Sequence, residues 1–253
     1  MKILHDANMQ EPIVGSFRGG TVAYYSEPAP GRLGANEDAA LVDERGLLAV
    51  ADGVGGSAGG ERAAQHLVTL LAETPPERSG ILDALERANT EIAALGVGAC
   101  STVAIVAIEE GRARSYHVGD SMILVVGQRG RRKLQAISHS PVGYAIEAGV
   151  LDEEEALHHD ELHVVSNLVG TADMRIEVST PIRLAPRDTV VIASDGLSDN
   201  LHMEEIVETV RKGPLEKAAR RLAHEARTRM REPDGERPSK PDDLTFLLYR
   251  PTT

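Results

Sequence analysis

Carboxylates stand at one edge of several apolar segments of this sequence. They are Glu37 and Asp38 before "AALVD", Asp52 after "LLAVA", Asp120 after "YHVG", Asp195 after "TVVIAS", and Asp242 and Asp243 before "LTFLLY". A single Asp-Gly pair is usually an ordinary turn. If the apolar segments are neighbouring strands, however, their carboxylates converge, and converged carboxylates cannot all stay ionised without cations. The pattern therefore predicts a cation site built from strand ends.

The chemistry of such a site follows from its donor atoms. An all-oxygen ligand set suits hard ions such as Mg²⁺ or Mn²⁺ rather than zinc or copper. Two such ions about 3.5–4 Å apart, bridged by a carboxylate, lower the pKa of a shared water and make it a nucleophile. This chemistry fits the hydrolysis of phosphate esters.

The segment around Asp52, "LLAVADGVGGSAGGERAA", has a second interpretation. Residues 53–58 fit the loose G-x-G-x-x-A pattern of nucleotide-binding loops. Asp52 at the mouth of that loop would repel a pyrophosphate unless cations intervene. A second helix is also predicted where a dinucleotide-binding unit would continue with a parallel strand. Both observations favour a metal site beside Asp52 over direct phosphate binding by the loop.

The elements that must hold these carboxylates are strands in antiparallel runs, with helices clustered between them. Apolar residues at helical spacing predict helices over about 60–73, 80–95, 203–212 and 215–231. Two successive hairpins over about 101–137 predict a β-meander. This grouping favours an α+β fold with helices packed on sheet faces. The polar, histidine-rich stretch at about 140–170 predicts a flap-like excursion from a single domain that spans 1–253.

The composition excludes several classes of protein. The chain has 253 residues and a formal net charge of −12, so it lacks the excess of basic residues with which proteins bind nucleic acid or anionic membranes. No apolar run approaches the roughly 20 residues that span a bilayer. The single cysteine, Cys100, permits no intramolecular disulfide and fits a reducing compartment. We therefore expect a cytoplasmic protein that contacts neither nucleic acid nor membrane.

The order of the motifs resembles that of a known family. The motifs are "GANEDAALVD", "AVADGVGGSAGGERAA", "GACSTVAIVAI", "HVGDSMILVV", "VIASDGLSDN" and "PDDLTFLL". They resemble the metal-dependent Ser/Thr protein phosphatases, the PPM or type 2C family, and its bacterial single-domain members most. The resemblance implies a four-layer α-β-β-α sandwich, in which two antiparallel sheets are flanked by helices. It also implies two Mn²⁺ or Mg²⁺ ions at one end of the sandwich and a third ion near Asp120.

The resemblance also implies a role for each carboxylate. By position, Asp52 matches the carboxylate that bridges the two ions, and Gly53 offers its carbonyl to the second ion. Asp195 and Asp242 match the other carboxylates of the first ion. The acidic pair near the second ion, and the aspartate of a third, weaker site that shares Asp195, correspond to Glu37, Asp38 and Asp120.

The sequence departs from the family pattern at groups that handle the substrate. The family places an arginine five residues before its equivalent of Asp38 to bind the substrate phosphate, but residue 33 is leucine and Arg32 lies six residues before. A one-residue bulge would still deliver Arg32 to this position. Val54 stands where some members carry a histidine general acid, and Asp243 replaces the usual asparagine.

Together these features predict a phosphoprotein phosphatase. It would hydrolyse phosphoserine and phosphothreonine by attack of a water bridged between two Mn²⁺ or Mg²⁺ ions. Its partners would be phosphorylated proteins, with a Ser/Thr kinase acting in opposition, and we expect a monomer. The alternative is a pseudophosphatase, a binding or regulatory module with weak or no turnover. Degenerate members usually lose metal-binding aspartates, whereas this chain keeps Asp38, Asp52, Asp195 and Asp242, which favours the enzyme.

Overall fold

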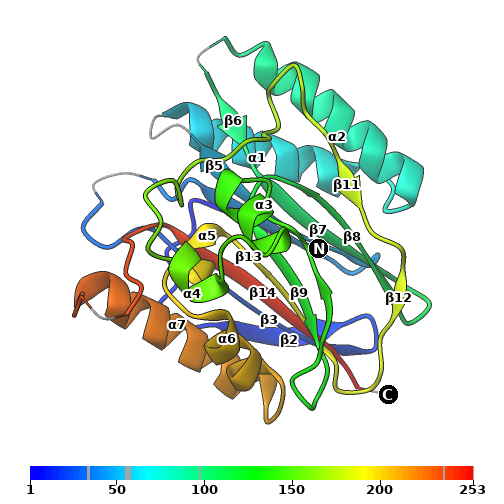
Figure 1. Ribbon diagram of the computed structural model, residues 1–253. Coiled ribbons are helices and arrows are strands. Elements are labelled where there is room, and N and C mark those ends of the chain that lie inside the picture. Colours follow the sequence, from blue (N-terminus) through cyan, green and yellow to red (C-terminus); the bar gives the residue numbers. More distant parts are fainter. Residues whose placement is uncertain (33–34, 55–57, 97, 236, 253) are drawn as a thin grey trace.

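A computed structural model describes residues 1–32, 35–54, 58–96, 98–235 and 237–252 of the chain. Within these residues the strands form two antiparallel sheets that stack face to face, and helices cover the outer face of each sheet (Figure 1). The four-layer α-β-β-α sandwich expected from the sequence is confirmed.

The first sheet is organised around a hairpin of two largely buried strands, β4 and β5. Its strands lie in the order β1 (Lys2–His5), β4 (Asp38–Asp43), β5 (Leu47–Val54), β7 (Val103–Glu109), β8 (Arg112–Val118) and β11 (Glu177–Val178), with β6 (Cys100–Ser101) paired to β5 and β12 (Ile182–Arg183) paired to β8. Both faces of this sheet are covered, which explains why β4 and β5 carry almost continuous apolar sequence.

The second sheet has the C-terminal strand in its interior. The strands lie in the order β10 (Arg132–Gln135), β9 (Met122–Val126), β13 (Thr189–Ala193), β14 (Leu244–Pro251), β3 (Gly20–Glu27) and β2 (Ile13–Phe17). Strand β14 pairs with β3 from Leu244 opposite Glu27 to Pro251 opposite Gly20. Segments from near the two ends of the chain therefore pair in the middle of this sheet.

Amphipathic helices supply the two outer layers. They are α1 (Ala58–Glu73) and α2 (Arg78–Ala93) on the first sheet, and α5 (Asp195–Ser198), α6 (Met203–Val210) and α7 (Leu215–Arg231) on the second. Leu67 and Leu71, one turn apart on α1, are buried against the first sheet, and Leu222 and Ala226 of α7 are buried against the second. Among the described residues, no helix has the length and apolar character needed to cross a membrane.

The segment 101–137 is divided between the sheets and does not form the single meander that its pattern predicts. The hairpin β7–β8 belongs to the first sheet, and the hairpin β9–β10 belongs to the second. The chain crosses from one sheet to the other at Gly119, Asp120 and Ser121. Strand β9 pairs with β13, which comes much later in the chain, so the local pattern contains no signal for this crossing.

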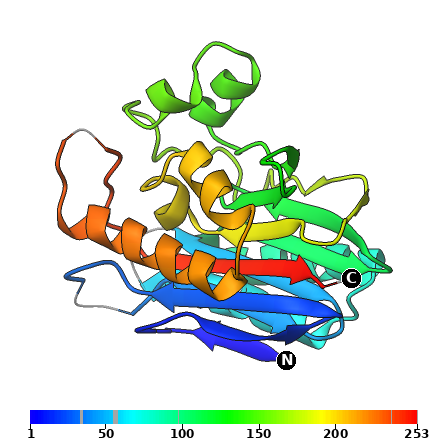
Figure 2. The ribbon, with the colours of Figure 1, turned by 90° about the horizontal axis from the view of Figure 1, so that it is seen from below.

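The chain leaves the sheets between β10 and β11. This segment contains α3 (Pro141–Glu147) and α4 (Glu153–Ala156), which project away from the sandwich (Figure 2). Ser140 caps α3 by accepting a hydrogen bond from the N–H of Gly143 at 2.9 Å. Asp152 and Glu155 form a capping box at α4. Local capping residues thus specify the two short helices of this region.

Candidate metal centre

Strand register brings Asp38 and Asp52 together. The two residues are direct partners in the antiparallel pair β4–β5. Side chains alternate along a strand, and Leu48 and Val50 of β5 belong to the core between the two sheets. Asp52 continues that series and faces the same interior, as does Asp38, which shares a face of β4 with Ala40. Two carboxylates therefore enter the space between the sheets at one end.

The second sheet provides the opposite wall of this space. Ser194, which directly follows β13, donates a hydrogen bond from its Oγ to Asp38 Oδ2 at 2.7 Å. The same Oγ accepts the N–H of Thr245 in β14 at 3.1 Å. Asp195 follows Ser194, and Asp242 lies just before β14. The ends of four central strands, two from each sheet, thus converge on one cluster of carboxylates.

The inner part of the cluster is short of positive charge. Asp38 is 1% exposed, and its Oδ1 has no hydrogen-bond partner in the part of the chain that the structure describes. Burial and the carboxylate of Asp243 hold the pKa of Asp38 well above its ordinary value. Burial and the carboxylates of Asp38 and Asp195 do the same to the pKa of Asp52. Ionised carboxylates at these positions require a cation between them.

The outer part of the cluster contains one lysine. Lys240 Nζ lies 2.7 Å from Asp195 Oδ2, 2.8 Å from Asp199 Oδ2 and 3.2 Å from Asp242 Oδ2. Burial and the charge of Asp195 nevertheless raise the pKa of Asp199 to about 8, of Asp120 to about 7 and of Asp242 to about 6. The lysine offsets only part of the repulsion among these carboxylates.

Arg32 forms ion pairs at the rim of the cluster. Its Nη2 lies 2.6 Å from Glu37 Oε2, and its Nη1 lies 2.9 Å from Asp243 Oδ2. Asp243 also accepts the N–H of Glu37 at 2.7 Å and the N–H of Ala29 at 2.7 Å. The aspartate that replaces the family's asparagine therefore fixes the segment that carries Arg32 and Glu37.

Two glycines allow the strand ends to approach each other. A Cβ added to Gly53 would lie 2.3 Å from the carbonyl carbon of Gly60 in α1, and one added to Gly196 would lie 2.0 Å from the carbonyl oxygen of Asp243. A larger residue at Gly53 would push β5 away from α1, and one at Gly196 would push α5 away from Asp243. Residues 55–57, the middle of the G-x-G-x-x-A pattern, lie outside the described residues.

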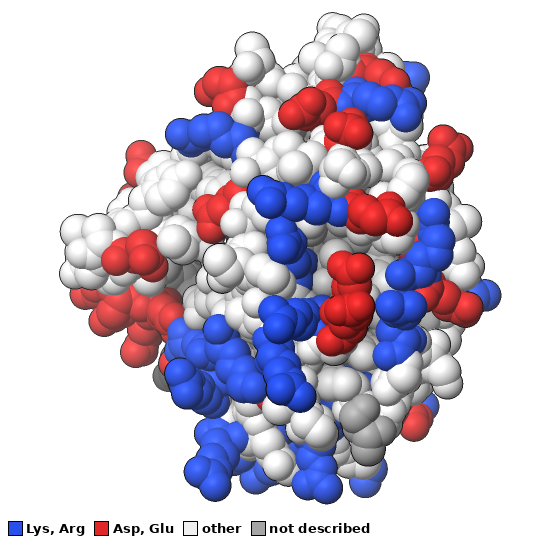
Figure 3. All heavy atoms as spheres, turned by 90° about the vertical axis from the view of Figure 1, so that its right-hand side faces the viewer, with Lys and Arg blue, Asp and Glu red and all other residues white. Residues whose placement is uncertain are grey.

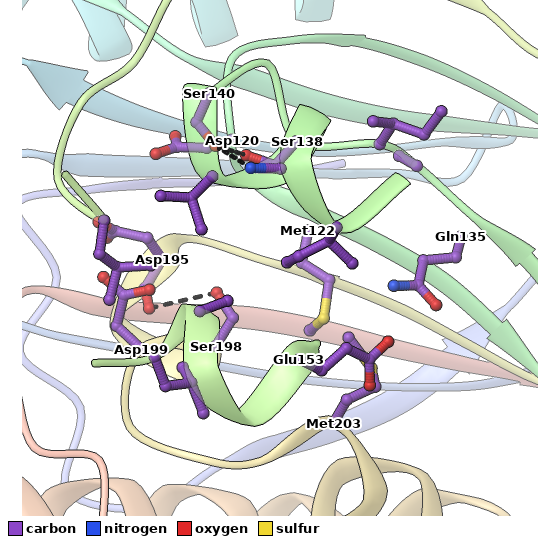
Figure 4. A pocket seen from close by; sticks show the side chains of 18 of the residues that line it. Asp120, Met122, Gln135, Ser138, Ser140, Glu153, Asp195, Ser198, Asp199 and Met203 are labelled. Atoms are coloured by element: carbon purple, nitrogen blue, oxygen red, sulfur yellow. Dashed lines mark hydrogen bonds between the residues drawn. The ribbon is translucent and has the colours of Figure 1, made fainter. Parts of the chain in front are cut away.

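A cavity of about 360 Å³ opens beside the outer part of the cluster. Asp120, Asp195 and Asp199 line one end of it, and the remaining lining includes residues of α3, α4, β9, β10 and α6. Figure 4 shows Asp195 and Asp199 side by side at this end, and Met122 and Met203 further along the cavity. The carboxylates are therefore reached from a largely apolar recess beneath the projecting helices.

A histidine pair supports the turn that carries Asp120. His139 Nδ1 accepts the N–H of Gly119 at 3.1 Å and the side-chain amide of Asn167 at 2.8 Å. Its Nε2 therefore bears the proton and donates to Glu177 Oε2 at 3.2 Å. His117 stacks on His139 with ring centroids 4.3 Å apart, and its Nε2 donates to a backbone carbonyl at 2.9 Å. Although His117, His139 and Glu177 are close enough to hold an ion, these hydrogen bonds satisfy them as a structural support.

The structure places all the predicted site residues at this end of the sandwich. The carboxylate of Asp195 raises the pKa of Asp38, Asp52, Asp120 and Asp242. Arg32 and Glu37 form the rim, and Gly53 is the residue after Asp52 on β5.

Sequence reasoning missed Asp199 and Lys240. Asp199 lies four residues after Asp195, one helical turn away, and this spacing was an available signal. Lys240 lies between Ser239 and Pro241 in a loop rich in proline and charge. A lysine in such a loop is usually solvated, so the sequence alone contained no signal for its position.

Comparisons with known proteins agree with this architecture. The family model described as "Protein phosphatase 2C" matches residues 34–232. A putative protein phosphatase 2C-type of Streptococcus pyogenes is 33% identical over 176 residues, which cover 64% of this chain and 71% of the relative. The PPM Ser-Thr phosphatase MsPP of Mycobacterium smegmatis, solved in complex with cacodylate, is 27% identical, with a TM-score of 0.76 over 90% of this chain and 97% of that one.

A third comparison concerns the fold alone. The catalytic domain of the serine/threonine phosphatase PstP, solved in complex with two manganese ions, is 24% identical, with a TM-score of 0.76 over 92% of this chain and 98% of that one. The family match spans most of the sequence and strands of both sheets, and the carboxylates that gather between those sheets lie in the motifs that first suggested the family. The chain therefore belongs to the protein phosphatase 2C family of metal-dependent serine/threonine phosphatases.

Proposed function

We propose that this chain removes phosphate from phosphoserine and phosphothreonine in proteins at the carboxylate cluster between its sheets. The observation that carries the proposal is the convergence of Asp38, Asp52, Asp195 and Asp242 from two sheets, with Asp38 Oδ1 buried and unpartnered within the described residues. Carboxylates with raised pKa values and only oxygen donors suit divalent cations. The donor set therefore fits Mn²⁺ or Mg²⁺.

The residues divide between two ion positions. Carboxylates from both sheets act on the pKa of Asp52, so Asp52 is the group that would be shared by both ions. Asp195 and Asp242 would complete one position. Glu37, Asp38 and the carbonyl of Gly53 would serve the other, directly or through water. Ions bound there would neutralise the carboxylates and lower the pKa of a water that attacks phosphorus.

The protein's own residues would orient the substrate. Arg32 is 28% exposed at the rim, where its guanidinium can reach solvent while it remains paired with Glu37 and Asp243. A guanidinium offers five donors in a planar fork that matches phosphate oxygens. We assign it to the phosphate of the substrate, where it would also stabilise charge on the equatorial oxygens during transfer.

The projecting segment would receive the rest of the substrate. We propose one phosphatase domain over 1–253, in which the excursion at about 140–170 forms a flap over the cavity beside Asp120 and Asp195. A phosphorylated peptide would extend from the carboxylate cluster along this cavity. The substrates are then phosphorylated proteins, opposed by a Ser/Thr kinase. The single cysteine is compatible with a cytoplasmic location, and we propose a monomer.

The alternative, a pseudophosphatase, makes the opposite prediction about turnover. A binding module needs the fold but has no use for a buried, repulsive cluster of carboxylates, which costs stability in the absence of ions. The retention of the complete set favours the enzyme.

Replacement of Asp52 tests the proposal directly. The variant Asp52→Asn should lose Mn²⁺-dependent hydrolysis of a phosphothreonine peptide by at least about a hundredfold, because it removes the central electrostatic group. The matched control is Asp83→Asn, which changes an exposed aspartate of α2 and should retain full activity. Turnover is measured as phosphate release, with folding checked by circular dichroism. Equal activity in Asp52→Asn, or in metal-free wild-type protein, would refute the mechanism.

A further inference from the structure

The ammonium group of Lys240 occupies a defined position in the outer part of the carboxylate cluster. It forms ion pairs with three aspartates: Asp195 at 2.7 Å, Asp199 at 2.8 Å and Asp242 at 3.2 Å. Two of these contacts also meet hydrogen-bond geometry, those to Asp195 and Asp199. The side chain is 33% exposed, so one cation of the protein itself is surrounded by the acidic groups of the site.

The main chain holds Lys240 in this position. Asn200, which is fully buried, accepts the N–H of Lys240 and donates to the carbonyl of Lys240, both at 2.9 Å. The same amide group donates to the carbonyl of Gly196 in α5 at 2.9 Å. The helical turn that carries Asp195 and Asp199 is therefore tied to the loop that carries Lys240. The position of Lys240 is therefore fixed by buried hydrogen bonds of the site.

This position overlaps the place where the family resemblance implies a third, weaker ion, beside Asp120 and Asp195. A divalent ion would bind a carboxylate oxygen at about 2.0–2.6 Å, but Asp195 Oδ2 already accepts the ammonium of Lys240 at 2.7 Å. Two cations that compete for one oxygen atom repel each other strongly at such a distance.

We propose that Lys240 is a tethered cation that takes the place of a third divalent ion, so that this chain binds two ions and has no third site at Asp120 and Asp195. The inference rests on the proposed metal centre. Lys240 contacts no reacting atom in this arrangement, so it is a positioning residue. It holds the carboxylates of Asp195, Asp199 and Asp242 around one ammonium group.

Counting bound ions in matched variants tests the inference. Mn²⁺ bound per chain is measured by equilibrium dialysis with elemental analysis at millimolar free Mn²⁺, for wild type, Lys240→Met, Lys240→Arg and Lys217→Met. Lys240→Met keeps most of the side-chain length and removes the charge, and Lys217→Met changes an exposed lysine of α7. We expect two ions in wild type, Lys240→Arg and Lys217→Met, and three in Lys240→Met.

The double variant Lys240→Met/Asp199→Asn identifies the new site. If the extra ion occupies the position of the ammonium, removal of the Asp199 carboxylate should weaken its binding at least tenfold and leave the other two ions in place. Equal counts in wild type and Lys240→Met, or three ions in wild type, would overturn the role of Lys240. A wild-type protein that binds no Mn²⁺ would instead overturn the metal centre itself.

A labelling experiment keeps the inference testable if Lys240→Met fails to fold. Wild-type protein is acetylated with a limiting amount of acetic anhydride, with and without saturating Mn²⁺, and modification of Lys240 is compared with that of Lys217 by mass spectrometry. Because its ammonium is held by carboxylates, Lys240 should react several-fold more slowly than Lys217 in both conditions. Labelling of Lys240 that rises to the level of Lys217 when Mn²⁺ binds would show that an ion displaces the ammonium, and would overturn the inference.

Discussion

At the scale of single residues, Arg32 forms ion pairs with two carboxylates at the rim, and it is also the group that we assign to the substrate phosphate. The family spacing would place an arginine at residue 33, and the chain has Arg32 instead. In the structure its guanidinium bridges Glu37 and Asp243 across the rim of the carboxylate cluster. Asp243 therefore does more than add negative charge, because it sets the position of the arginine.

Replacing Arg32 should affect substrate binding more than turnover. In Arg32→Ala we expect KM for a phosphothreonine peptide to rise about tenfold, because a charge-assisted hydrogen bond to phosphate is worth about 1.5–3 kcal/mol, with a smaller fall in kcat. Steady-state kinetics with saturating Mn²⁺ measure both values. The exposed Arg87, on α2, gives the control variant Arg87→Ala. An unchanged KM combined with weaker Mn²⁺ binding would mean that Arg32 acts only on Glu37 and Asp243.

At the scale of elements, the turn between β8 and β9 carries the chain, and Asp120 with it, from one sheet to the other. His139 clamps this turn, since its main-chain N–H donates to the carbonyl of Gly119 at 2.9 Å and its ring accepts the N–H of Gly119 at 3.1 Å. Asn167 extends the clamp to Arg175, with which it exchanges hydrogen bonds at 2.7 and 3.0 Å. The chain around α3 and α4 is thereby linked to the edge of the first sheet.

Removing the ring of His139 should destabilise this crossing. His139→Ala leaves the N–H of Gly119 and one N–H of the Asn167 amide without an acceptor, so we expect the free energy of unfolding to fall by about 1–3 kcal/mol. Urea denaturation followed by circular dichroism measures the change, and the exposed His158, changed to alanine, is the control. Identical midpoints for wild type and His139→Ala would show that water or a shifted side chain replaces these hydrogen bonds.

The elements differ in how far the sequence predicts them. The helix predicted over 215–231 matches α7, and that over about 60–73 differs from α1 by two residues at its start, because one apolar stripe determines a helix locally. The assignment of β9 to the second sheet could not be predicted, since it depends on pairing with the distant strand β13. The short strands β11 and β12 contain two residues each, too few to form a recognisable alternation.

In the carboxylate cluster, too, the residues set by local sequence could be predicted, whereas those set by distant contacts could not. Aspartates at strand ends are visible in the sequence, and their convergence follows once the strands are placed side by side. The contacts of Lys240 depend instead on Asn200, which lies 40 residues away in the sequence and fixes the loop through its side chain. No pattern within the loop itself indicates that the lysine turns inward.

At the scale of the whole molecule, the net charge of −12 is unevenly distributed. On the face shown in Figure 3, acidic and basic side chains are mixed, and basic side chains gather in its lower part. Several aspartates are meanwhile withdrawn into the cluster between the sheets, where Asp38 is 1% exposed. Part of the negative charge therefore lies on aspartates that repel one another in this cluster. Because protonation neutralises these carboxylates, the repulsion depends on pH.

The metal-free protein should lose stability as pH rises. The folded-state pKa values of Asp242, Asp120 and Asp199, about 6, 7 and 8, exceed the ordinary value of 3.8. Between about pH 4 and pH 8 the folded chain therefore binds more protons than the unfolded chain, and its free energy of unfolding falls as pH rises. The raised pKa of Lys240 adds no pH dependence here, because its ordinary value of 10.5 already lies above this window.

Thermal unfolding from pH 5 to pH 8, with and without saturating Mn²⁺, measures this effect. The gap in Tm between the two forms should widen by several degrees, since about 1 kcal/mol shifts the Tm of a chain of this size by about 2–4 °C. The comparison removes contributions from outside the centre, such as the lowered pKa of buried His117, which favours stability at higher pH. A gap that stays constant with pH would contradict the assignment of repulsion to this cluster.

The division of ligands between two sheets has a mechanical consequence. Asp38 and Asp52 belong to strands of one layer, whereas Asp195 and Asp242 flank strands of the other. Ions bound by carboxylates of both sheets would hold the two sheets together at this end. Without the ions, repulsion between the carboxylates would push the sheets apart. Metal binding would then slow the local unfolding of the strands. Amide hydrogen exchange would be suppressed in β5 and β13 far beyond the residues that contact the ions.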